Sequence, residues 1–369
     1  MALIAAVAGL GLLAFAVTSG CAGPLARVAV TWGLTDLPGG HKTHARPTPY
    51  LGGLAMALGT LTAVPAIAGD TTVTAIVAGA LAVAVLGLLD DIVPQPPATR
   101  LAVETVVAGA VVLNGVCVPL TGTWLDLVLT TAWLVVITNS FNLLDNLDGT
   151  LGGVAVTGGS ALAATAFLLD RPAAGVLLVV VCGSALGFLR HNWAPAKLFM
   201  GDSGSLFLGF VIASCAAVTT SMATPTGAIL PVAAGLLLPT LVATVDTAVV
   251  VISRHRGGRP LLLGGLDHVA HRLRAAGLGT RLIATSLAFA AGLSGLLALA
   301  VSIGLLPAHL ALLGAAALGL ALAAAPPALR QTRQRRPAGP EFAAANCCAV
   351  GARSGSVSHC AASPTSNAR

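Results

Sequence analysis

Acidic side chains recur in short motifs that sit at the ends of apolar stretches. Asp90 and Asp91 stand side by side after an apolar run, and adjacent carboxylates repel each other unless a cation or a proton lies nearby. Asp202 lies between glycines at the entrance of a later apolar run. Backbone N–H groups at such a position can meet phosphate oxygens, or the aspartate can simply cap a helix. The motifs indicate chemistry with a cation, a phosphate or both.

A third motif combines amides and acids at three-residue spacing across the end of an apolar run. Its members are Asn139, Asn142, Asp145 and Asp148. Residues at this spacing project from one side of a helical turn, and four aligned polar groups are more than one helix cap needs. Carboxylate and amide oxygens are ligands that suit Mg²⁺. The segment therefore predicts a polar site at a helix end.

Histidines and arginines collect in the most basic loop. His268 and His271 are three residues apart and face one way on a helix, but two histidines without a third ligand make a poor zinc site. Arginine suits phosphate, so an anion-binding loop fits better. The arginines of this region are Arg254, Arg256, Arg259 and Arg272. Asp246 lies inside the preceding apolar run, as a packing or counter-ion residue.

Together these groups predict phosphoryl transfer to a lipid. The acids suit Mg²⁺, the glycines allow a phosphate to approach closely, and the arginines match the charge of a diphosphate. Nearly all acids of these motifs fall on one side of the apolar runs. We therefore expect a diphosphate substrate to be handled at the cytosolic surface of a membrane.

The composition dictates what must position these residues. Hydrophobic residues make up 56% of the 369 residues and charged ones only 9%, far below the globular average of about 25%. This excludes a soluble domain and predicts an all-α, polytopic transmembrane bundle. The net charge of +6 is spread over the loops between apolar runs, which indicates membrane topology and no nucleic-acid partner. The seven cysteines contain no CxxC motif, so no disulfide framework or zinc site is expected.

A span needs roughly 20 apolar residues, which predicts about 11 spans. Their expected limits are 2–20, 48–68, 71–89, 100–119, 124–140, 150–169, 173–190, 204–221, 226–252, 282–305 and 308–328.

Basic residues fall in alternate loops, as the positive-inside rule requires. Arg27 is expected in the loop after the first span, and of 19 basic residues only Arg171 falls on the opposite side. The N-terminus is therefore expected outside and the C-terminus in the cytosol. Residues 1–330 form the membrane domain, and residues 331–369 are expected to be a disordered basic cytosolic tail, because they have no apolar periodicity.

The motifs and their order resemble the polyprenyl-phosphate N-acetylhexosamine-1-phosphate transferase family. The resemblance covers roughly residues 30–275 and is most specific over 192–209. It rests on the stretches 36–44, 47–53, 90–91, 139–149, 192–205 and 268–273. It implies that a polyprenyl-phosphate oxygen attacks the sugar-bearing phosphorus of a UDP-sugar. The products are a polyprenyl-diphosphate sugar and UMP, in the first membrane step of cell-envelope polysaccharide synthesis.

The resemblance also implies roles for single residues. Mg²⁺, or Mn²⁺ in its place, is held by Asp202 and Asn142. The residues implied in catalysis are Asp90, Asp91 and Arg100, with His268, His271 and Arg272 on the pyrophosphate. The residues implied in substrate binding are Asn192, Phe199 and Asp148 on uridine, with Asn139, Asp145, Lys42 and His44 around the cytosolic mouth.

Four positions depart from the family pattern. Arg100 replaces the usual lysine, Glu104 a glutamine and His41 an arginine, while Ala270 stands where the family has the middle histidine of His-x-His-His-Arg. Arginine keeps the positive charge but presents it as a wider fork. The pattern that ends at Arg272 favours the GlcNAc-1-phosphate branch.

Other readings stay open. One is a phospho-MurNAc-pentapeptide transferase of the same family, and another is a scaffold with an inactive site. A secondary transporter with intramembrane carboxylates would place its site near the midplane between repeated halves. The partners expected are a UDP-sugar, a polyprenyl phosphate and the bilayer of the plasma membrane, and a homodimer is compatible with the sequence.

Overall fold

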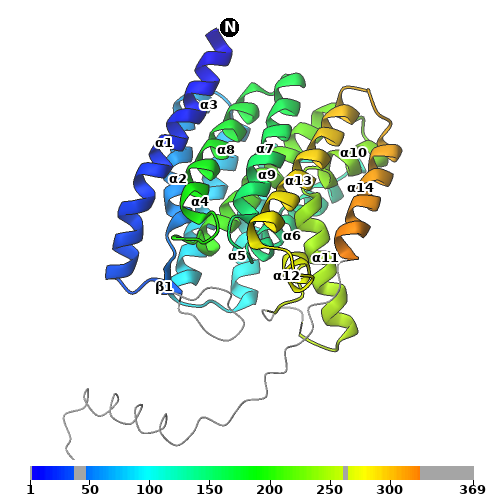
Figure 1. The fold of residues 1–369 in the computed structure, drawn as a ribbon. Coiled ribbons are helices and arrows are strands. Elements are labelled where there is room, and N and C mark those ends of the chain that lie inside the picture. The colour runs from blue at the N-terminus through cyan, green and yellow to red at the C-terminus, as the bar shows by residue number, and fades with distance from the viewer. Residues whose placement is uncertain (1, 37–46, 261–264, 325–369) are drawn as a thin grey trace, which may run out of the picture. The chain divides into compact units, whose positions relative to one another are not determined.

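The computed structural model describes residues 2–36, 47–260 and 265–324, and these are almost entirely helical (Figure 1). The only strands of the described part are β1 (Thr35–Asp36) and β2 (Thr48–Pro49), which pair antiparallel. This agrees with the predicted all-α class. Lys42 and His44 lie outside the described residues.

The helices follow the apolar runs of the sequence. Their bounds are α1 Ala2–Thr31, α2 Gly52–Thr60, the 3-10 turn η1 Leu61–Ala63, α3 Val64–Ile67, α4 Thr71–Ile92, α5 Pro97–Leu113, α6 Leu125–Leu144, α7 Thr150–Leu168, α8 Pro172–Asn192, α9 Gly201–Ala223, α10 Ile229–Leu237, α11 Leu241–Arg256, α12 Val269–Ala275, α13 Thr280–Ser302 and α14 Ala308–Ala323.

Each of the predicted spans overlaps at least one of these helices. Among the residues that the structure describes, seven helices are long and apolar enough to cross a membrane, namely α1, α4, α6, α7, α8, α9 and α13, and the bent pair α10 and α11 makes up to eight. The segment 52–67 and α14 are shorter apolar helices. The multi-span bundle is confirmed, and the total of about 11 spans stays a prediction.

Two predicted boundaries are wrong. α1 continues to Thr31 through Pro24, so Arg27 lies inside the helix and not in a loop. The run predicted as one span at 226–252 is two helices, α10 and α11, which meet at 88°. Pro239 lies in the break, where proline lacks the N–H for a helical hydrogen bond and clashes with the preceding turn. Hydropathy alone does not register such interruptions.

Helix α9 is the central helix of the bundle. Its most apolar window is entirely buried, and it packs against α4, α6 and α2. On another side α1, α8, α7 and α13 succeed one another as neighbours (Figure 1). Small residues let the backbones approach closely, and an added Cβ at Gly87 of α4 would lie 2.5 Å from backbone atoms of Asp202. The first turn of α9 therefore packs closely against the end of α4.

We predict that Gly87→Ala destabilises the protein by about 1–3 kcal/mol, the usual cost of overpacking, because the methyl group would displace the first turn of α9. The measurement is the thermal midpoint of the purified protein in detergent. Gly20→Ala in α1 is the matched control, since in the described part of the chain nothing that packs against the helix lies within 4 Å of its added Cβ. That change should be neutral or stabilise by about 0.5–1 kcal/mol. Equal midpoints for the two variants would contradict the close packing.

Candidate active site

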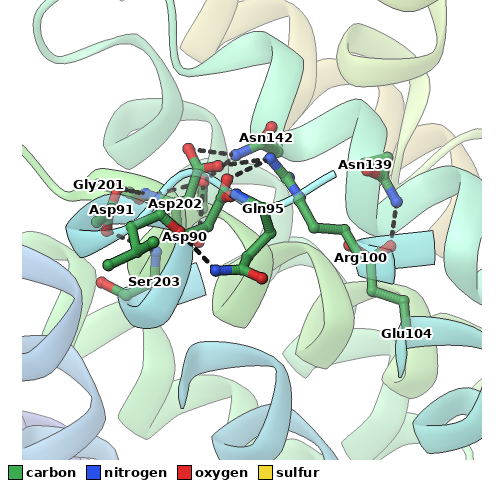
Figure 2. Close-up of polar contacts among 12 residues, drawn as sticks. Asp90, Asp91, Gln95, Arg100, Glu104, Asn139, Asn142, Gly201, Asp202 and Ser203 are labelled. Carbon is green, nitrogen blue, oxygen red and sulfur yellow. Dashed lines mark hydrogen bonds and ion pairs between the residues drawn. The ribbon is translucent and has the colours of Figure 1, made fainter. Parts of the chain in front are cut away.

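One arginine joins the ends of three helices. Nη1 of Arg100, in the first turn of α5, donates to Oδ2 of Asp90 at 2.7 Å and to Oδ2 of Asp202 at 2.9 Å (Figure 2). Asp90 lies in the last turn of α4, and Asp202 in the first turn of α9. The backbone N–H of Gln95 also donates to Oδ1 of Asp90, at 2.5 Å. The structure thus brings together three residues predicted to act in the reaction.

The carboxylate of Asp91 binds the N-terminus of α9. It accepts hydrogen bonds from the backbone N–H groups of Asp202 at 3.0 Å and Ser203 at 3.3 Å, where a negative charge also complements the helix dipole. Gly201 has φ of 71°, and an added Cβ there would lie 2.4 Å from Oδ2 of Asp91. These N–H groups, expected to meet phosphate, bind Asp91, which therefore positions the helix that carries Asp202.

The amides of α6 reach two different acids. Nδ2 of Asn142 donates to Oδ1 of Asp202 at 3.0 Å and to Oγ of Ser205 at 2.9 Å. Nδ2 of Asn139 donates to Oε2 of Glu104 (Figure 2), while Oε1 of Glu104 is buried and has no hydrogen-bond partner among the described residues. Asn142 thus belongs to the Asp202 cluster, and Asn139 links α6 to α5.

Asp145 follows the last residue of α6 and is repelled by the other acids of the site. Burial, together with the charges of Asp202, Asp91 and Asp148, raises the pKa of Asp145 to about 7. Loss of hydration on burial is the larger cause, and repulsion by the neighbouring carboxylates adds to it. Several acids thus lie around Asp202, and Arg100 offsets the charge of only part of them.

Of the residues predicted to contact uridine, Phe199 lies on the loop that leads into α9, Asn192 ends α8, and Asp148 lies between α6 and α7. Asn192 is 4% exposed, and its amide is used within the protein: Oδ1 accepts from Gly149 N at 2.9 Å, and Nδ2 donates to Leu198 O at 3.0 Å. Oδ2 of Asp148 accepts from Ala196 N at 2.9 Å. Asn192 and Asp148 therefore shape the loop that carries Phe199.

The backbone of Phe199 is held by the segment that precedes α2. Its N–H donates to Pro49 O at 2.8 Å, and its carbonyl accepts from Gly52 N at 3.0 Å. Tyr50 of the same segment donates its hydroxyl to the backbone carbonyl of Asp91 at 2.9 Å. Residues 47–53, matched above only as a motif, thus connect the Phe199 loop to the end of α4.

The histidine loop is organised by two further acids. His268 directs Nδ1 to Oδ2 of Asp246 at 2.7 Å, and the ring of His271 meets the ring of His268 edge-on at 5.9 Å. Burial lowers the pKa of His271 to about 4, helped by the neighbouring His268, so His271 is neutral at pH 7. Nε of Arg272 donates to the backbone carbonyl of Asp267 at 3.0 Å.

Asp267 binds arginines that the sequence assigned to phosphate. Its carboxylate accepts from Nη2 of Arg259 at 2.5 Å, from Nε of Arg254 at 3.4 Å and from Oγ of Ser253 at 2.9 Å. Burial raises the pKa of Asp267, but the hydrogen bonds of Arg259 and Ser253 outweigh it and hold the pKa below its usual value. Sequence reasoning missed this role, although an acid next to His268 in a basic loop was a usable signal.

The donor set around Asp202 suits a hard cation. Within residues 2–36, 47–260 and 265–324, no three His, Cys, Asp or Glu side chains are grouped as a complete metal site. Mg²⁺ needs fewer protein ligands, because it keeps waters and takes substrate phosphates. Asp202 and the amide oxygen of Asn142 are oxygen donors, and the carboxyl of Asp145 lies close enough to interact with Asp202. The residues present therefore fit Mg²⁺.

Comparison with known proteins agrees with these motifs. Residues 73–220 match the family model described as glycosyl transferase family 4. The chain is 34% identical over 271 residues to the probable undecaprenyl-phosphate N-acetylglucosaminyl 1-phosphate transferase of Bacillus subtilis, covering 69% of this chain and 74% of the relative. It is 32% identical over 307 residues to the decaprenyl-phosphate N-acetylglucosaminephosphotransferase of Mycolicibacterium smegmatis, covering 71% of this chain and 74% of the relative.

Another branch of the family matches over a shorter region. The phospho-N-acetylmuramoyl-pentapeptide-transferase of Staphylococcus epidermidis is 43% identical over 82 residues, which are 22% of this chain and 26% of the relative. The two longer matches given above are to proteins named as N-acetylglucosamine enzymes. The chain belongs to glycosyl transferase family 4, among the polyprenyl-phosphate N-acetylhexosamine-1-phosphate transferases.

Proposed function

We propose that the protein transfers GlcNAc-1-phosphate from UDP-GlcNAc to a polyprenyl phosphate. An oxygen of the lipid phosphate bonds to the sugar-bearing phosphorus, the bond from that phosphorus to the bridging oxygen breaks, and UMP leaves. The single observation that carries the proposal is Arg100 held between Asp90 and Asp202. The guanidinium of Arg100, a group that suits phosphate, therefore lies beside the proposed metal ligand. The names of the long-matching relatives support the sugar.

Asp202 and Asn142 would hold the cation of this reaction. Mg²⁺, or Mn²⁺ in its place, supplies neutralisation of the diphosphate charge when bound. Nδ2 of Asn142 donates to Asp202, so the two side chains are already adjacent. Arg100 can turn from the two carboxylates toward the lipid phosphate, which brings its own negative charge. These residues bind and orient the two phosphates.

An apolar groove beside the site supports a lipid acceptor. It has a volume of about 630 Å³ between α5 and α6. Its lining residues are Leu101, Thr105, Gly109, Val112, Leu113, Leu127, Val128, Thr131, Ala132, Val135 and Val136. Leu101 directly follows Arg100, and the carbonyl of Val135 accepts from Asn139. A polyprenyl chain in this groove would carry its phosphate to the cluster of Arg100.

The site is proposed to face the cytosol at the plasma membrane. The histidine loop and its arginines lie in the most basic segment between apolar runs, and basic loops stay inside. A UDP-sugar is a cytosolic substrate, which agrees with this orientation.

The test is a transfer assay with the purified full-length protein. UMP release and lipid product are measured with UDP-GlcNAc, UDP-GalNAc and UDP-MurNAc-pentapeptide, each with and without polyprenyl phosphate. We expect lipid-dependent UMP release with UDP-GlcNAc and little with UDP-MurNAc-pentapeptide. The reverse preference would assign the chain to the muramoyl-pentapeptide branch. Absence of release with every donor would refute a transferase.

We predict that Asp202→Asn abolishes transfer at millimolar Mg²⁺. The variant keeps the size of the side chain but loses the charge that a hard cation prefers, and UMP release measures the effect. Asp126→Asn is the matched control: Asp126 is 5% exposed and accepts backbone N–H groups of Thr121 and Gly122 at the far end of α6. Near-normal turnover of Asp202→Asn would contradict the metal assignment.

We predict that Asp90→Asn stays deficient when the pH is raised to about 8.5. A phosphate monoester has its second pKa near 6, so the lipid phosphate is mostly dianionic at neutral pH and needs little help from a base. Asp90 already accepts from Arg100 and Gln95, as a positioning group would. The measurement is kcat for UMP release between neutral pH and about pH 8.5. Full recovery of the variant at the higher pH would establish a base role.

We predict that Asp145→Asn raises thermal stability at pH 7 in the absence of Mg²⁺. The folded carboxyl has its pKa raised to about 7, well above that of a free aspartate, so wild-type stability is full below the unfolded pKa and is lost as the pH rises through the folded pKa. The advantage of the variant should therefore vanish as the pH falls toward the unfolded value. Thermal midpoints across this range measure it, and a constant difference would contradict the charge surplus.

A further inference from the structure

Asp246 is a buried acid that the proposed reaction leaves without a role. It lies in the second turn of α11 and is 1% exposed. Both of its carboxylate oxygens are used, and both point to the start of α12, which carries His271 and Arg272. An ionisable group this deeply buried is costly unless a partner compensates it.

We propose that Asp246 is the positioning residue that orients His268 toward the diphosphate of the donor. The inference rests on the proposed function, because His268 is taken to contact the diphosphate. It is carried by the juxtaposition of Oδ2 of Asp246 and Nδ1 of His268 at 2.7 Å. The same carboxylate accepts the backbone N–H of Val269 at 2.7 Å through Oδ1.

These two contacts lock the ring and its backbone together. His268 is the residue before the first turn of α12, and its ring is 7% exposed. One carboxylate oxygen of Asp246 accepts from the N–H of Val269, and the other contacts Nδ1 of His268. Both the ring and the backbone next to it are therefore fixed. His271 packs against the ring edge-on at 5.9 Å, which limits rotation further. The ring can then present only Nε2 to a substrate.

The hydrogen bonds that the two imidazole nitrogens can make determine what this arrangement can do. A histidine that donates from Nδ1 to a carboxylate and from Nε2 to a phosphate oxygen needs both protons and carries a positive charge. Asp246 offsets that charge within a buried setting. In Asp246→Asn the amide nitrogen would donate to Nδ1, and only a neutral ring with its proton on Nε2 satisfies this contact. The variant keeps an acceptor for Val269 but removes the charged form.

The test is a double-mutant cycle on the full-length enzyme with UDP-GlcNAc and polyprenyl phosphate. We expect Asp246→Asn and His268→Ala each to lower kcat by about tenfold or more, the usual cost of losing a carboxylate behind a functional histidine. The double variant should fall no more than about threefold below His268→Ala, because residues that act through one another are not additive. Multiplied losses would overturn the proposal, since Asp246 would then act independently of His268.

Two controls separate positioning from folding. Asp126→Asn neutralises another buried, backbone-capping carboxylate at the far end of α6 and should leave kcat unchanged. Thermal midpoints of all variants report folding. A large drop of the midpoint in Asp246→Asn, matched by an additive cycle, would show a purely structural role and overturn the proposal.

A labelling experiment keeps the proposal testable without catalysis. Diethylpyrocarbonate modifies free imidazole nitrogens, and peptide mass spectrometry compares His268 with the exposed His255 in the same chain. We expect Asp246→Ala to increase the relative labelling rate of His268 severalfold, because this variant removes both side-chain contacts that anchor the ring and its backbone. If the wild type releases no UMP, the proposed function fails, and this rate alone decides the pairing. An unchanged rate would overturn it.

Discussion

The architecture of the site depends on one shared cation. A single nitrogen of Arg100 holds Asp90 and Asp202 and so ties together the ends of α4, α5 and α9. These side chains are partly shielded from solvent, so the loss of one partner leaves a charge with less hydration to compensate it. Packing of small residues, such as Gly87 against the first turn of α9, determines how closely these helix ends approach.

The surroundings of Arg100 and the histidine loop differ in the ratio of acidic to basic side chains. Burial and the charges of the other acids at the entrance of α9 raise the pKa of Asp145 to about 7, whereas on the histidine loop the single acid Asp267 binds two arginines, Arg254 and Arg259. A surplus of carboxylates is costly in the absence of substrate and is relieved when cations arrive. Perturbed groups of this kind mark functional sites. The ion-paired loop, in contrast, supports His268 and Arg272.

Hydropathy predicted a helix in every expected span, because burial of apolar side chains is encoded locally. The motifs also grouped Asp90, Asp202 and Asn142 at one site. Neither hydropathy nor the motifs predicted the bend at Pro239, the extension of α1 through Pro24, or the pairing of Asp246 with His268. Those features depend on which helix lies beside which. Long-range partners such as Asp91 and the N–H of Asp202, 111 residues apart, are set by tertiary packing alone.

The placement of Asp90 and Asp91 in the last turn of α4 also bears on how the chain is made. During synthesis these acids leave the ribosome long before Asp202, their partner helix being 111 residues further on. The cost of a charge in a bilayer is greatest at its centre and falls toward the interface. At a helix end, both carboxylates can remain hydrated while the later helices insert. Nascent α4 can therefore enter the membrane alone, and the polar centre assembles only when α9 arrives.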